Sequence, residues 1–230
     1  MPSMIHDFDL SERASVELTA AGSVADVMIS AAAVFAALTG LFGLVPIATA
    51  ACATLAIGAA LLFEGGAIGA RFAPSLKHRE EDSLTKGDVL GGITADFIAG
   101  IAGIVFGALA LGGIAPMPLI ATAVLVYSAA LLIGCAALVH ATTTLRDGVA
   151  LPSTRADTVL LAAGAQLVVG IVAFVLGFLA LLGVASMTLM LVSLLLIAIS
   201  QLASGMALGS KMVRMLRTRG QAEPVTFKDA

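Results

Sequence analysis

The chain has 230 residues, of which 60% are hydrophobic and 12% charged, and its mean hydropathy is +1.08. Soluble domains average about 45–50% apolar and about 25% charged residues, so this chain has too little polar surface to cover a soluble globule. Its formal net charge of -3 provides no basic surface for nucleic acid. The composition therefore excludes a soluble enzyme, a disordered chain and a nucleic-acid-binding protein, and it predicts an all-helical integral membrane protein.

Six apolar stretches are long enough to cross the hydrocarbon layer of a bilayer, which needs about 20 helical residues. Their hydrophobicity is continuous rather than alternating, and this favours membrane helices over the strands of a barrel. The predicted spans are residues 20–44, 46–70, 89–115, 117–140, 158–185 and 187–210.

Short uncharged turns join these spans into pairs, which predicts three helical hairpins. The turns lie at Gly43–Pro46, Gly113–Pro116 and Gly183–Ser186. All twelve Lys and Arg residues lie in the remaining connections and in the terminal segments, on one side of the predicted membrane. The positive-inside rule then places both termini in the cytoplasm, as expected for a multi-pass membrane protein.

The three hairpins recur with a period of 70 residues. The turn residues Pro46, Pro116 and Ser186 are separated by this interval. Because a two-span unit returns the chain to the side where it began, all three copies have one orientation, and a pseudo-threefold axis along the membrane normal can relate them. The inverted repeats of many alternating-access transporters need the opposite relation, which disfavours a transporter of that class.

We expect one integral membrane domain with hairpins as its units. Its parts are a cytoplasmic leader at 1–19, hairpins at 20–71, 89–141 and 158–211, cytoplasmic connections at 72–88 and 142–157, and a cytoplasmic tail at 212–230.

Glycines spaced four residues apart indicate close helix packing, because small residues let backbones approach each other in lipid. The pairs are Gly65 with Gly69, Gly103 with Gly107, and Gly205 with Gly209. We expect them to mediate internal packing or a contact within a homo-oligomer or a larger membrane complex.

Three carboxylates interrupt the predicted spans: Asp26, Glu64 and Asp96. A charge in the membrane costs several kcal/mol, so each should face the bundle interior, a partner or water. All three are expected at similar depth near the cytoplasmic side, close to the polar residues Gln166, Gln201 and Ser204. Two interpretations stay open: a vestibule that binds a proton, a cation or a small polar solute, or a set of interfacial acids and interhelical hydrogen bonds.

Motifs of enzymes and of cofactor sites are missing from the sequence. There is no nucleophile elbow, zinc-protease motif or phosphate-binding loop, and the His residues are too scattered for haem or zinc. Cys52 and Cys135 lie in apolar stretches, as expected of packing residues. We predict a protein that is not an enzyme and has no catalytic residues, cofactor or metal.

The segment after the last span is basic, with the sequence KMVRMLRTR at 211–219. It either forms an ordinary positive-inside stop or attracts anionic lipid headgroups through Lys211, Arg214 and Arg217.

Small residues recur at each turn in a recognisable order. The patterns are Ala37-x-x-Gly40-x-x-Gly43-x-x-Pro46, Gly107-x-x-x-x-x-Gly113-x-x-Pro116 and Gly177-x-x-x-x-x-Gly183-x-x-Ser186, with Ala59-Ala-Leu-Leu62 and Ala129-Ala-Leu-Leu132 half a helix later. With them the chain resembles the HdeD family of small bacterial inner-membrane proteins over about residues 20–211. The resemblance implies two-helix repeats, an association with acid resistance at high cell density, and no established catalytic residues. This chain departs from the family in its lack of Trp, its charged connection at 71–88 and its Ser186.

Three hypotheses for the function follow. The first is a non-enzymatic, HdeD-like protein in acid or envelope stress. The second is a small proton- or cation-linked channel or transporter that uses the intramembrane carboxylates. The third is an accessory subunit of a larger membrane complex.

Overall fold

Every element in the described part of the chain is a helix. The computed structural model describes residues 24–78, 83–148 and 153–220, and the side chains at 24–66, 94–136 and 164–206. The first helix is described over Val24–Leu41, and it is followed by α2 (Pro46–His78), α3 (Ser83–Leu111), α4 (Pro116–Gly148), α5 (Ser153–Leu181) and α6 (Ser186–Gly220). Six helices are long and apolar enough to cross a membrane, so the prediction of an all-helical chain with six candidate spans is confirmed.

The helices continue well past the apolar segments. α2 has 33 residues, or about 50 Å at 1.5 Å per residue, whereas its apolar segment is Pro46–Gly66. The connections expected at 72–88 and 142–157 are therefore mostly helical. Hydropathy marks where a chain leaves the hydrocarbon layer, but it does not mark where the helix itself ends.

The three short turns have one backbone conformation. Gly43, Gly113 and Gly183 have φ angles of 83°, 79° and 86°. In the first turn the Gly43 amide donates to the Gly40 carbonyl at 3.0 Å, and the Leu44 amide donates to the Thr39 carbonyl at 3.3 Å. This is the Schellman pattern, in which a left-handed residue satisfies the last carbonyls of a helix.

A second residue with a positive φ angle lies between each of these glycines and the next helix. Val45, Ala115 and Ala185 have φ angles of 44°, 38° and 40°, and each directly precedes the first residue of a helix. Pro46 and Pro116 suit the first helical position, where the missing amide hydrogen has no partner to lose. α6 begins at Ser186 after a turn with the same backbone angles, so the turn conformation does not depend on proline.

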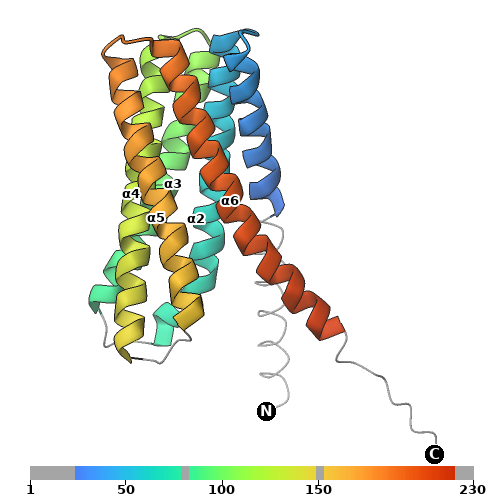
Figure 1. Ribbon diagram of the computed structural model, residues 1–230, viewed down its shortest axis with the longest axis vertical. Coiled ribbons are helices and arrows are strands. Elements are labelled where there is room, and N and C mark those ends of the chain that lie inside the picture. Colours follow the sequence, from blue (N-terminus) through green and yellow to red (C-terminus); the bar gives the residue numbers. More distant parts are fainter. Residues whose placement is uncertain (1–23, 79–82, 149–152, 221–230) are drawn as a thin grey trace, which may run out of the picture.

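The helices form a closed arrangement with α2, α4 and α6 in mutual contact. α3 packs against α2 and α4, while α5 packs against α4 and α6. The first helix meets α6, since a Cβ atom added at Gly40 would lie 2.7 Å from Leu191 Cδ2. Figure 1 shows the short turns together at one end of the bundle and α6 leaning away from it toward the other end.

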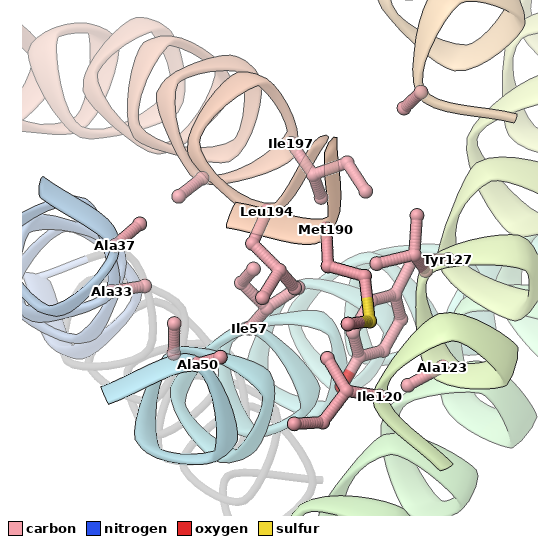
Figure 2. Packing of buried hydrophobic residues seen from close by; sticks show 14 of the residues in the cluster. Ala33, Ala37, Ala50, Ile57, Ile120, Ala123, Tyr127, Met190, Leu194 and Ile197 are labelled. Atoms are coloured by element: carbon pink, nitrogen blue, oxygen red, sulfur yellow. The ribbon is translucent and has the colours of Figure 1, made fainter. Parts of the chain in front are cut away.

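The centre of the bundle is a packed apolar core. Ile57 on α2, Tyr127 on α4 and Ile197 on α6 are each 0% exposed, and their side chains meet with Met190 and Leu194 in Figure 2. Since lipid provides no hydrophobic drive between helices, close van der Waals packing of this kind holds membrane bundles together.

Tyr127 reaches across the core to a neighbouring helix. Its hydroxyl donates a hydrogen bond of 2.6 Å to the Thr54 carbonyl on α2. Gly103 on α3 leaves the space that the phenol occupies, because a Cβ atom there would overlap the ring. A buried phenol needs such a partner, and here it ties α4 to α2.

Glycines bring α2 and α3 into backbone contact. A Cβ atom added at Gly58 would lie 2.8 Å from the Gly100 carbonyl oxygen, and one added at Gly100 would lie 2.7 Å from the Gly58 carbonyl oxygen. This pair could not be predicted from the sequence, because the two glycines lie on different helices.

The glycines expected at helix contacts have the following positions. Gly65, Gly103, Gly107 and Gly205 are buried, whereas Gly69 and Gly209 lie outside the residues whose surroundings are described. A Cβ atom at Gly107 would lie 2.7 Å from Leu55 Cγ on α2. Among these four, Gly205 is the one that borders the polar residues described next.

Candidate functional site

The charged side chains among those described are Asp26, Glu64 and Asp96, and all three are acidic. They lie on the first helix, α2 and α3, toward the end of the bundle away from the short turns. No Lys, Arg or His occurs in the same three stretches, so the acids have no cationic partner there.

Glu64 lies where three elements meet. Ser204 and Gln201 face its carboxyl group from α6, and the carboxyl groups of Asp96 and Asp26 interact with it electrostatically. The Glu64 side chain is half-buried. We name Asp26, Glu64, Asp96, Gln201 and Ser204 the polar cluster.

Asp26 is held in place between the first helix and α6. It is 2% exposed, and the Ser30 hydroxyl one turn later donates to its Oδ1 at 3.4 Å. Its Oδ2 packs on Gly205, where an added Cβ atom would lie only 2.5 Å away. A glycine at 205 therefore makes the space that this carboxylate occupies.

Asp96 also lies near a glycine, but at a longer distance than Asp26. Its two carboxyl oxygens each lie 3.9 Å from the position of an added Cβ atom at Gly134 on α4. Gly134 stands 70 residues after Glu64, so the second hairpin has a glycine where the first has a carboxylate.

Gln201 is a buried amide with an incomplete set of hydrogen bonds. It is 0% exposed, and its Oε1 accepts a bond of 3.3 Å from the Ser204 hydroxyl. Its Nε2 has no hydrogen-bond partner among the described residues. The side chain faces Glu64, but the two groups are not in hydrogen-bonding geometry.

Of the six polar residues singled out in the sequence, four thus lie around Glu64, which is the fifth. Gln166 is half-buried on α5, and it is not among the side chains that face Glu64. Ser30 was not singled out, although its position one helical turn after Asp26 places it on the same face.

The cluster is chemically suited to hold positive charge. Neighbouring carboxylates repel one another, and the repulsion is stronger in a protein interior than in water. A bound proton or cation offsets that repulsion. The described residues include no group of three His, Cys, Asp or Glu side chains placed to hold a metal ion.

The two cysteines differ from each other in exposure. Cys135 on α4 is buried, and Cys52 on α2 is exposed. Cys135 therefore packs as expected, whereas Cys52 is on the side of α2 that faces outward.

This chain matches no protein-family model, no curated protein and no solved structure. Its function is therefore inferred from the polar cluster and from the helices that carry it.

Proposed function

We propose that this protein is a non-enzymatic, multi-pass protein of the bacterial cytoplasmic membrane whose polar cluster binds and releases a proton or a small cation, as part of a small channel or transporter. One observation carries the proposal: the Glu64 carboxyl group is faced by two further carboxyl groups and by the Ser204 and Gln201 side chains.

The absence of basic residues in these stretches supports positive charge as the ligand. An ion pair inside a bundle would neutralise a buried acid permanently, but no Lys, Arg or His accompanies the acids in the described stretches. Intramembrane carboxylates of this kind are characteristic of ion pathways and proton relays.

Access to the cluster is proposed from the cytoplasmic side. Glu64 stands seven residues before Arg71 on α2, which is about 10 Å along a helix. The basic residues follow the apolar segments at the end away from the short turns, and the positive-inside rule assigns that end to the cytoplasm.

We also propose that the bundle consists of three copies of one hairpin around a pseudo-threefold axis. Equivalent contacts support this: Gly100 on α3 packs against Leu62 of α2, and Gly170 on α5 packs against Leu132 of α4. The members of each pair are 70 residues from their counterparts. The third hairpin has Gln166 and Ser204 where the first has Asp26 and Glu64, so the described side chains form one acidic cluster rather than three.

A flux measurement tests the proposal. The protein is reconstituted in liposomes that contain a pH-sensitive dye, and proton flux is driven by a pH gradient or by a gradient of Na⁺ or K⁺. We expect Glu64→Gln to reduce the flux at least tenfold, because it removes the ionisable group. Gln166→Leu is the matched control and should retain the flux of the unaltered protein. Equal flux in Glu64→Gln and the unaltered protein would show that the cluster is structural.

Acid or envelope stress is the physiological setting that we propose for this binding. The support is the resemblance of the motifs at the three turns, Gly43–Pro46, Gly113–Pro116 and Gly183–Ser186, to those of the HdeD family. A strain that depends on this protein for survival at low pH should lose that survival with Glu64→Gln and keep it with Gln166→Leu. Equal survival of both strains would contradict the proposed role in acid stress.

A further inference from the structure

Gln201 breaks an apolar pattern in the core. The residues 70 and 140 positions earlier are Leu131 and Leu61, both 1% exposed, whereas Gln201 is 0% exposed. A buried amide hydrogen without a partner costs about 1–3 kcal/mol. Since leucine fills the same position twice in this chain, packing alone does not explain the glutamine.

The amide lies between a hydroxyl group and a carboxyl group. Its Oε1 accepts from the Ser204 hydroxyl at 3.3 Å, while the unpartnered Nε2 belongs to the side chain that faces Glu64. The Ser204 hydroxyl also lies 2.9 Å from the Gln201 main-chain carbonyl, so it has a second acceptor available.

An amide of this kind can serve a carboxyl group in either protonation state, because it has a donor end and an acceptor end. When Glu64 is ionised, Nε2 can donate to the carboxylate while Oε1 accepts from Ser204. When Glu64 carries a proton, the amide can rotate by 180°. Its Oε1 then accepts a hydrogen bond from the Glu64 O–H. Its Nε2 then donates to the Ser204 oxygen, and the Ser204 hydroxyl donates to the main-chain carbonyl.

We propose that Gln201 is a positioning residue whose amide turns over each time Glu64 gains or loses a proton. The inference rests on the proposed function, because it assumes that Glu64 exchanges protons. The proton passes between water and a Glu64 carboxyl oxygen, and no covalent bond of Gln201 forms or breaks. Gln201 and Ser204 exchange only their hydrogen bonds.

The two other carboxyl groups around Glu64 do not perform this role when they are ionised. Asp96 from α3 and Asp26 from the first helix present carboxyl groups, and Asp26 is already bonded to Ser30 and packed on Gly205. An ionised carboxylate accepts hydrogen bonds but donates none. Gln201 on α6 is thus the amide in the cluster that can donate in one state and accept in the other.

Infrared difference spectra between acidic and alkaline pH test this inference on the full chain in lipid nanodiscs. We expect a carboxyl C=O band that is lost in Glu64→Gln, together with a glutamine side-chain amide band. The amide band should be lost in Glu64→Gln and in Gln201→Leu, which introduces the residue found at positions 61 and 131. Gln166→Leu is the control and should retain both bands.

A second variant keeps the test independent of the leucine's effect on folding. Gln201→Asn retains an amide but shortens its reach, so the reorienting amide signal should be absent although the carboxyl band remains. A carboxyl band from Glu64 with an amide band that persists in Gln201→Leu or Gln201→Asn would overturn the role of Gln201 and leave the proposed function intact. Absence of any band that depends on Glu64 would overturn both.

Discussion

At the scale of single residues, two glycines make room for larger side chains from neighbouring helices. Asp26 fits because position 205 is a glycine, and Tyr127 fits because position 103 is a glycine. Because charged residues are scarce in the spans, the sequence was enough to single out the three acids as candidate site residues. The missing partner of Gln201 Nε2 could not be predicted, because it depends on which groups reach that atom from three helices.

Gly205→Ala should reduce the free energy of unfolding by about 1–3 kcal/mol, the usual cost of overpacking. The reason is that the new methyl group would lie 2.5 Å from Asp26 Oδ2. Stability in detergent or bicelles is the measurement. Combined with Asp26→Ala, the same change should cost less, since residues in contact are not additive. An equal cost in both backgrounds would contradict the contact.

Tyr127→Phe should lower the free energy of unfolding by about 0.5–1.5 kcal/mol, because it removes one buried hydrogen bond. The lost bond is the one of 2.6 Å to the Thr54 carbonyl, and the ring and its packing remain. Ser128→Ala is a control on the same helix, since Ser128 bonds within α4 to the Val124 carbonyl. A Tyr127→Phe protein as stable as the unaltered one would show that the bond contributes nothing.

At the scale of elements, hydropathy and turn residues predicted the apolar helices and the short turns, but they did not predict the helix ends. Gly43 and Pro46 identify a turn through a left-handed glycine and a first-position proline. The continuation of α2 to His78 leaves no comparable signal, since polar residues are compatible with helix and with loop. The contact of Gly58 with Gly100 also could not be predicted, because spacing within one helix does not say which other helix it meets.

Gly113→Ala should destabilise the protein by about 1–2 kcal/mol, the cost of a left-handed conformation for a residue with a Cβ atom. Gly113 has a φ of 79° and open space around it, so conformation rather than a clash is responsible. Gly66→Ala is the matched control, because Gly66 also has open space but lies within α2. It should stabilise the helix by up to about 1 kcal/mol. The same effect from both changes would contradict the turn assignment.

At the scale of the whole molecule, six candidate spans were predictable because membrane helices must satisfy their own backbone hydrogen bonds. The contacts among α2, α4 and α6 were not predictable from the hairpins alone. They arise because both helices of each hairpin must find partners, and the first helix closes the arrangement against α6 through Gly40 and Gly205.

The proposed orientation predicts where reporters will lie. A reporter fused after residue 230 should be active only as a cytoplasmic reporter, and one inserted at the turn near Gly113 should be active only as a periplasmic reporter. The reason is that the basic residues follow the spans at the end away from the turns. The reverse pattern would contradict the orientation and the side from which the cluster is reached.

The most direct test of the central claim is the reaction of the protein in lipid with a hydrophobic carbodiimide. This reagent takes the proton of a carboxyl group within the membrane, and the carboxylate oxygen then adds to its central carbon. Mass analysis of the labelled protein and its peptides should find the reagent on Glu64, with faster labelling at acidic than at alkaline pH, and Glu64→Gln should abolish it. Labelling that is independent of pH, or that never reaches Glu64, would contradict a proton-exchanging site in this bundle.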